Sequence, residues 1–160
     1  MLVLAVGIWC VVVYSFRVAF FGNPLYNQLQ RTDTAVIEGA EEAATEGLDR
    51  TTQSEALFLQ RFSRLSLLEL GAFLLEIGLL VYLLVAGTLF WLSLVLLMKN
   101  VVMVAVSFSF ARMLTDGEGL FRSMRQLPRW LVWLDRASAT VSGCGFLYVF
   151  VTVSGLLNAG

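Results

Sequence analysis

Apolar residues fill long, nearly uninterrupted blocks of this chain, and two polar stretches separate the blocks. The first block covers residues 2–21, the second runs from residue 67 to residue 113, and the third covers about 138–158. Blocks of about 20 apolar residues are long enough to cross a bilayer as an α-helix. The pattern therefore predicts an all-α integral membrane protein, with residues 1–160 forming one polytopic domain.

The second block is too long for a single span. Its 47 residues would form a helix of about 70 Å, whereas the hydrocarbon core of a bilayer is about 30 Å thick. Ala86-Gly87-Thr88 is the plausible break, because glycine can take the backbone through a tight turn. We therefore predict four transmembrane helices, with a tight hairpin at Gly87 between the second and the third. They cover about 2–21, 66–86, 88–112 and 138–158.

The first polar stretch, 22–65, contains an acidic segment with a narrow apolar stripe. The apolar residues recur at helical spacing, which predicts an amphipathic helix over about 34–49. Two interpretations stay open. The helix lies solvated over the membrane surface, or it docks a partner subunit through Val36, Ile37 and Leu48.

The second polar stretch, 112–137, alternates arginines with apolar residues and contains two tryptophans. Arginines that snorkel and tryptophans at headgroup depth are typical of a helix in the membrane interface. We predict such a helix over about 119–136, either as an anchor or as a site for an anionic lipid headgroup. The residues expected to contact lipid are Arg122, Arg125, Arg129, Trp130 and Trp133.

Positive charges give the expected orientation. The two polar stretches together carry nine arginines, whereas the opposite side, with both termini and the Gly87 turn, carries no Lys or Arg. Cytoplasmic loops of membrane proteins are enriched in these residues. We therefore expect the two loops in the cytoplasm and both termini on the non-cytoplasmic side.

Four charged side chains lie well inside the predicted spans, and their depths match in pairs. Glu76 comes eleven residues before Gly87 and Lys99 twelve residues after it, so their depths differ by about 1.5 Å in an antiparallel hairpin. Glu69 and Arg17 match in the same way nearer the loops. A lone charge within the bilayer is costly, and an opposite charge at the same depth largely offsets that cost. We therefore predict two intramembrane ion pairs, Glu76 with Lys99 and Glu69 with Arg17.

Small and polar residues mark two further faces. Ser93, Asn100 and Ser107 recur every seven residues on the third span, a polar stripe typical of hydrogen bonds between helices. On the fourth span, small residues four apart let a neighbouring backbone come close, and this face either packs internally or contacts another subunit. Its residues are Ser138, Ala139, Ser142 and Gly143.

The composition of the chain excludes several kinds of chemical site. The chain contains no His, which excludes haem ligation through His, His-based zinc sites and a His general base. A net charge of -1 gives no reason to expect nucleic acid as a partner. No nucleophile–base pair, Gly-rich phosphate loop or metal motif is visible. We expect no enzymatic activity and no cofactor, and we expect membrane lipids and other integral membrane subunits as partners.

Three functions fit these features. The first is a non-catalytic structural or accessory subunit of a larger membrane-protein assembly, which holds or docks partner subunits in the bilayer. The second is a small transporter or a proton- or ion-relay protein that uses the intramembrane Glu, Lys and Arg residues. The third is a cofactor-holding subunit, in which Glu69, Glu76, Asn100 or a Met would bind a metal.

Overall fold

A computed structural model describes residues 2–46, 53–87, 89–114 and 128–158, and these residues are almost entirely helical. Four of the helices are long and apolar enough to cross a membrane, by length and composition. The prediction of an all-helical chain with four candidate spans is therefore confirmed. The helices are α1 (Leu2–Phe21), α2 (Pro24–Arg31), α3 (Thr34–Glu46), α4 (Gln53–Val85), α5 (Phe90–Leu114) and α7 (Arg129–Asn158).

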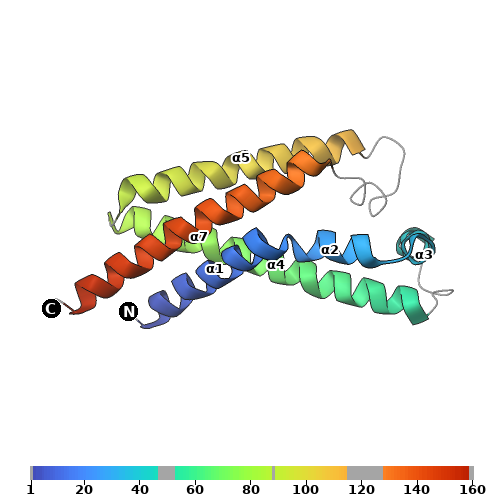
Figure 1. Ribbon diagram of the computed structural model, residues 1–160, viewed down its shortest axis with the longest axis horizontal. Coiled ribbons are helices and arrows are strands. Elements are labelled where there is room, and N and C mark those ends of the chain that lie inside the picture. Colours follow the sequence, from blue (N-terminus) through green and yellow to red (C-terminus); the bar gives the residue numbers. More distant parts are fainter. Residues whose placement is uncertain (1, 47–52, 88, 115–127, 159–160) are drawn as a thin grey trace.

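The four long helices, α1, α4, α5 and α7, form an elongated bundle (Figure 1). The start of α1, the end of α7 and the turn between α4 and α5 lie toward one end, which we call the turn end. The helices α2 and α3 lie at the opposite end, the loop end, beside the first half of α4. This arrangement is the one expected of an even number of antiparallel spans.

The chain reverses between α4 and α5 at the predicted glycine. Gly87 has a φ of +69°, a left-handed conformation that glycine adopts without steric cost. The amide of Ala86 donates to the carbonyl of Tyr82 over 2.9 Å, and the amide of Gly87 donates to that of Leu84 over 3.2 Å. These bonds satisfy carbonyls at the end of α4, so the helix closes before the chain turns back.

A short helix that the sequence analysis did not predict follows α1 directly. Gly22, with a φ of +80°, ends α1, and the side chain of Asn23 accepts hydrogen bonds from the amides of Leu25 and Tyr26 at 2.9 and 3.4 Å. Asn is a favoured N-cap residue, and Pro24 suits the first helical position. Gly22-Asn23-Pro24 therefore ends one helix and starts the next.

The sequence analysis predicted an interfacial helix at 119–136 that is separate from the fourth span. For residues 129–136 this prediction is wrong. Residues 129–136 are the first two turns of α7, which continues through the span without a break. Pro128 directly precedes this helix, and its carbonyl accepts from the amide of Leu131 over 2.9 Å. No helix-breaking residue follows it for many positions, so nothing stops the helix short of the membrane. Residues 115–127 lie outside the described part of the chain.

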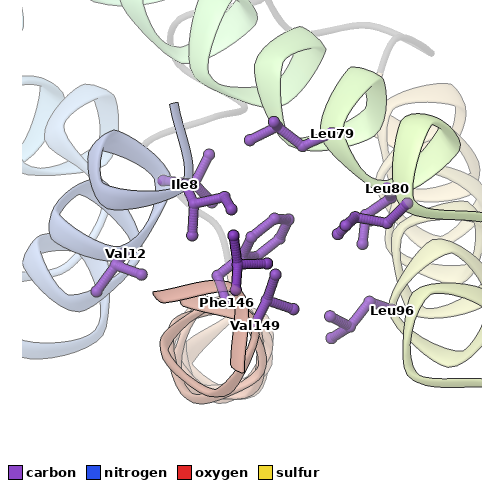
Figure 2. Packing of buried hydrophobic residues seen from close by; sticks show 10 residues of the cluster. Ile8, Val12, Leu79, Leu80, Leu96, Phe146 and Val149 are labelled. Carbon is purple, nitrogen blue, oxygen red and sulfur yellow. The ribbon is translucent and has the colours of Figure 1, made fainter. Parts of the chain in front are cut away.

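Two clusters of buried side chains hold the bundle together. The larger one fills the turn end between the four long helices, and Figure 2 shows Phe146 reaching from α7 into its centre. Within a bilayer such a cluster stabilises by close packing rather than by exclusion of water. Its members include Ile8, Val12, Leu79, Leu80, Leu96, Phe146 and Val149.

The smaller cluster lies at the loop end and joins α2, α3 and the start of α4. It contains Leu29, Ile37, Ala40 and Phe58, with Val36 packed against it. Ile37 is only 1% exposed, so the chain's own α4 covers the described part of the apolar stripe on α3. Ile37 is therefore not exposed to a partner in this structure, and docking of a partner on α3 stays a prediction. Residues 47–49 of the predicted helix, with Leu48, lie outside the described residues.

Candidate functional site

One carboxylate oxygen joins three of the long helices. Lys99 Nζ on α5 lies 3.4 Å from Glu76 Oε1 on α4, and Asn100 Nδ2 donates to the same oxygen over 2.9 Å. Ser142 Oγ on α7 also donates to it, over 2.7 Å. We call these four residues the Glu76 network. The structure thus brings together Glu76 and Lys99, the ion pair inferred from their matching depths.

The ammonium group of Lys99 uses its full capacity for hydrogen bonds. An ammonium carries three protons, and Lys99 Nζ has three acceptors in range. These are Glu76 Oε1 at 3.4 Å, the carbonyl of Ser138 at 3.5 Å, and Ser142 Oγ. The side chains of Lys99 and Glu76 are 18% and 14% exposed. A largely buried charge is tolerated when it is paired and hydrogen-bonded, and the Glu76 network meets both conditions.

The polar stripe on α5 spans three environments. Ser93 is buried in the turn end, and its Oγ has no hydrogen-bond partner among the described residues. Asn100 is 5% exposed and belongs to the Glu76 network. Ser107 is exposed and lines a cavity at the loop end. Ser93, Asn100 and Ser107 therefore share one face of α5, but of the three only Asn100 makes an observed hydrogen bond to another helix.

The small residues of α7 pack inside the bundle. A Cβ atom on buried Gly143 would lie 3.3 Å from the ring of Phe16 on α1, and one on Gly145 would lie 2.8 Å from Leu96 Cδ1 on α5. Ser142 belongs to the Glu76 network, and Ser138 and Ala139 line the cavity beside it. Of the two interpretations of this face, the structure supports internal packing.

Beside the Glu76 network lies a cavity of about 650 Å³, which we call the carboxylate cavity. Residues of α1, α4, α5 and α7 line it, on the loop-end side of the large apolar cluster. Three carboxylates, Glu69, Glu76 and Asp135, face one cationic side chain, Lys99. The cavity thus carries an excess of acidic groups within the span region.

The second predicted ion pair is wrong. Glu69 lines the carboxylate cavity with Tyr14, and its buried Oε1 has no hydrogen-bond partner in the described part of the chain. Arg17 is exposed and lines a different cavity. Tyr14 and Val18 of α1 line the carboxylate cavity, whereas the side chain of Arg17, between them in the sequence, lines the other cavity. Matching depth was therefore not enough to bring Arg17 to Glu69.

Sequence reasoning missed Asp135, because that residue was assigned to an interfacial helix. With α7 starting at Arg129, Asp135 stands three residues before Ser138 and seven before Ser142. Residues at these spacings share a helix face, and all three line the carboxylate cavity. This periodicity could have identified Asp135.

The residues expected to contact lipid fall into two groups. Arg129, Trp130 and Trp133 lie on the first turns of α7, where Trp130 is 54% and Trp133 70% exposed. Arg122 and Arg125 lie outside the described residues. Exposed tryptophans at the loop end fit headgroup depth, and lipid contact stays a prediction.

No group of three or more acidic or Cys side chains is placed to hold a metal ion among the described residues. No family model matches the chain, and neither a curated protein nor a solved structure matches it.

Proposed function

We propose that the protein is a non-catalytic structural or accessory subunit of a membrane-protein assembly, with the Glu76 network as a packing element. The observation that carries this proposal is the number of hydrogen bonds within the network. One oxygen of Glu76 receives three donors, and Lys99 has an acceptor for each of its protons. Such a network fixes the positions of three helices relative to one another.

A charged pair that is held by this many hydrogen bonds is a poor ion carrier for a physical reason. A group that passes ions or protons must exchange partners repeatedly, and each exchange here would leave a largely buried charge without its counter-charge. Removing one partner of a buried pair typically costs about 3–5 kcal/mol. The same property makes the network an effective clamp between α4, α5 and α7.

The outer surface of the bundle is the part that would contact partner subunits. Large apolar side chains face outward on the spans, such as Val3, Trp91 and Phe108, which are 83%, 76% and 71% exposed. In a bilayer these side chains contact lipid tails or neighbouring transmembrane helices. We further propose that the loop end, with its arginines, faces the cytoplasm.

Purification from native membranes in a mild detergent tests this proposal. We expect one or more integral membrane proteins to co-migrate in fixed ratio with the wild-type chain. The double variant Glu76→Gln/Lys99→Met should keep these partners, because it removes both charges and leaves the outer surface unchanged. A chain that migrates alone from every native source would contradict the assembly role.

A second candidate, a proton or ion relay, is favoured by the carboxylate cavity. Glu69 and Asp135 outnumber the available cations there, and Glu69 Oε1 has no hydrogen-bond partner among the described residues. Reconstitution into vesicles that contain a pH-sensitive dye separates the two functions. A relay predicts proton flux that Glu69→Gln abolishes, whereas a packing role predicts the same leak in protein-containing and empty vesicles.

A further inference from the structure

Arginines from three helices line a second cavity, at the loop end. Arg17 lies on α1, Arg31 on α2, and Arg61 and Arg64 on α4, around a volume of about 820 Å³. We call it the arginine cavity. No acidic side chain of the described residues lines it, and none of the four arginines forms an ion pair with a described carboxylate.

The walls of the arginine cavity are held in place by packing. Leu29 of α2 is buried against Ile37 of α3 and Phe58 of α4. Gln28 Nε2 donates to the carbonyl of Phe58 over 3.5 Å, which joins α2 to α4 directly. The backbone positions that carry Arg31, Arg61 and Arg64 are therefore fixed before any ligand arrives, and a preorganised site binds at a lower entropic cost.

The cavity lies where the long apolar run of α4 begins, which is the level expected of a membrane headgroup layer. Arg17 lies near the loop end of α1, and Arg61 and Arg64 come just before the long apolar run that starts at Leu67. Apolar side chains also line the cavity, among them Leu57. Guanidinium groups beside apolar side chains at this level suit a ligand that is anionic at one end.

Four like charges around one cavity repel one another, and an anion between them relieves this repulsion. Arginine binds phosphate through paired, charge-assisted hydrogen bonds, with a planar geometry that lysine lacks. We propose that the arginine cavity binds a phosphate group, carried either by an anionic phospholipid or by a soluble phosphate compound. Arg17, which does not pair with Glu69, would contact this phosphate group.

Direct binding measurements on the purified full-length chain test the proposal. Native mass spectrometry in a non-ionic detergent compares retention of phosphatidylglycerol with that of phosphatidylcholine, and calorimetry measures binding of inorganic phosphate. We expect retention of phosphatidylglycerol well above that of phosphatidylcholine. In Arg61→Gln/Arg64→Gln we expect affinity to fall about tenfold or more, since hydrogen bonds to charged groups are strong.

Three variants make the test specific. Arg129→Gln removes an exposed arginine of α7 that does not line the cavity. Because Arg129 is itself expected to contact lipid, this variant should weaken binding of phosphatidylglycerol far less than Arg61→Gln/Arg64→Gln does, and it should leave binding of inorganic phosphate unchanged. Arg61→Lys/Arg64→Lys keeps the charge but loses the paired hydrogen bonds, so its affinity should be intermediate. Should Arg61→Gln/Arg64→Gln fail to fold by circular dichroism, Arg17→Gln replaces it, with weaker binding again expected.

The two sources of phosphate give different results. Tight retention of phosphatidylglycerol with no detectable binding of inorganic phosphate identifies a lipid headgroup, whereas binding of both that depends on the cavity arginines identifies the phosphate group itself. An equal loss of binding in Arg129→Gln and Arg61→Gln/Arg64→Gln would overturn the proposal, because surface charge alone would then explain the data. Failure of the wild type to bind either probe would also overturn it.

Discussion

The turn end and the loop end of the bundle are built from the same four long helices, yet they are held together in different ways. At the turn end, side chains such as Ile8, Leu80 and Phe146 are at most 1% exposed and fill the space between the helices (Figure 2). At the loop end, the same helices surround the carboxylate cavity of about 650 Å³. The Glu76 network lies at the border between the two regions.

Different interactions therefore stabilise the two ends of the bundle. Apolar side chains in lipid gain stability only by close packing, so the turn end depends on shape complementarity. Polar side chains in the same surroundings must find hydrogen-bond partners, and the Glu76 network finds them across three helices. Glu69 Oε1 lies at the loop end and has no such partner among the described residues.

The largest effect is expected at the centre of the turn end. Phe146→Ala removes a ring that is 0% exposed, and loss of a buried Phe ring typically costs about 3–5 kcal/mol. The free energy of unfolding in mixed detergent micelles should fall by about this amount. Phe108→Ala, on a ring that is 71% exposed, serves as the control and should change it little. Equal effects of the two variants would show that the turn end is not the packed core.

A smaller effect is expected where α7 approaches α5. The Cβ of Gly145→Ala would lie 2.8 Å from Leu96 Cδ1, whereas that of Gly155→Ala meets open space. Both variants gain the same helix propensity, so their difference reports the close approach. Overpacking typically costs about 1–3 kcal/mol, and we expect Gly145→Ala to be less stable than Gly155→Ala by an amount in the lower part of that range. Indistinguishable melting temperatures would argue against tight packing of α7 on α5.

The smallest effect is expected at the loop end. Glu69→Gln removes a carboxylate that has no ion-pair partner among the described residues, so no counter-charge is left stranded. The melting temperature in detergent should stay the same or rise slightly, since an uncompensated charge within the span region is costly. A marked loss of stability would contradict the absence of a stabilising partner for the Glu69 carboxylate.

Sequence patterns predicted the four spans well because the bilayer requires long apolar helices. The pairing of Glu76 with Lys99 was also predictable, since a tight hairpin places its two helices side by side and their residues at matching depths. Glu69 and Arg17 lacked such a connection. Their depths agreed, but the direction of the Arg17 side chain could not be read from residue counts, and this side chain lines the arginine cavity.

Two other features escaped prediction for local reasons. The helix α2 has only 8 residues, too few for a clear periodic signal. Asp135 was missed because residues 119–136 were predicted to form an interfacial helix, whereas residues 129–136 belong to α7. The composition of this stretch does not show that its helix continues into the span.

The central claim is that Glu76 and Lys99 form a packing pair, and a double-mutant cycle tests it most directly. Thermal unfolding in mild detergent is measured for Glu76→Gln, Lys99→Met and the double variant. Each single change should cost about 3 kcal/mol, because it strands a largely buried charge. The double variant should lose clearly less than the sum of the two, with a coupling energy of about 1–3 kcal/mol. Additive losses, with no rescue in the double variant, would show that the two charges do not stabilise each other and would contradict the account.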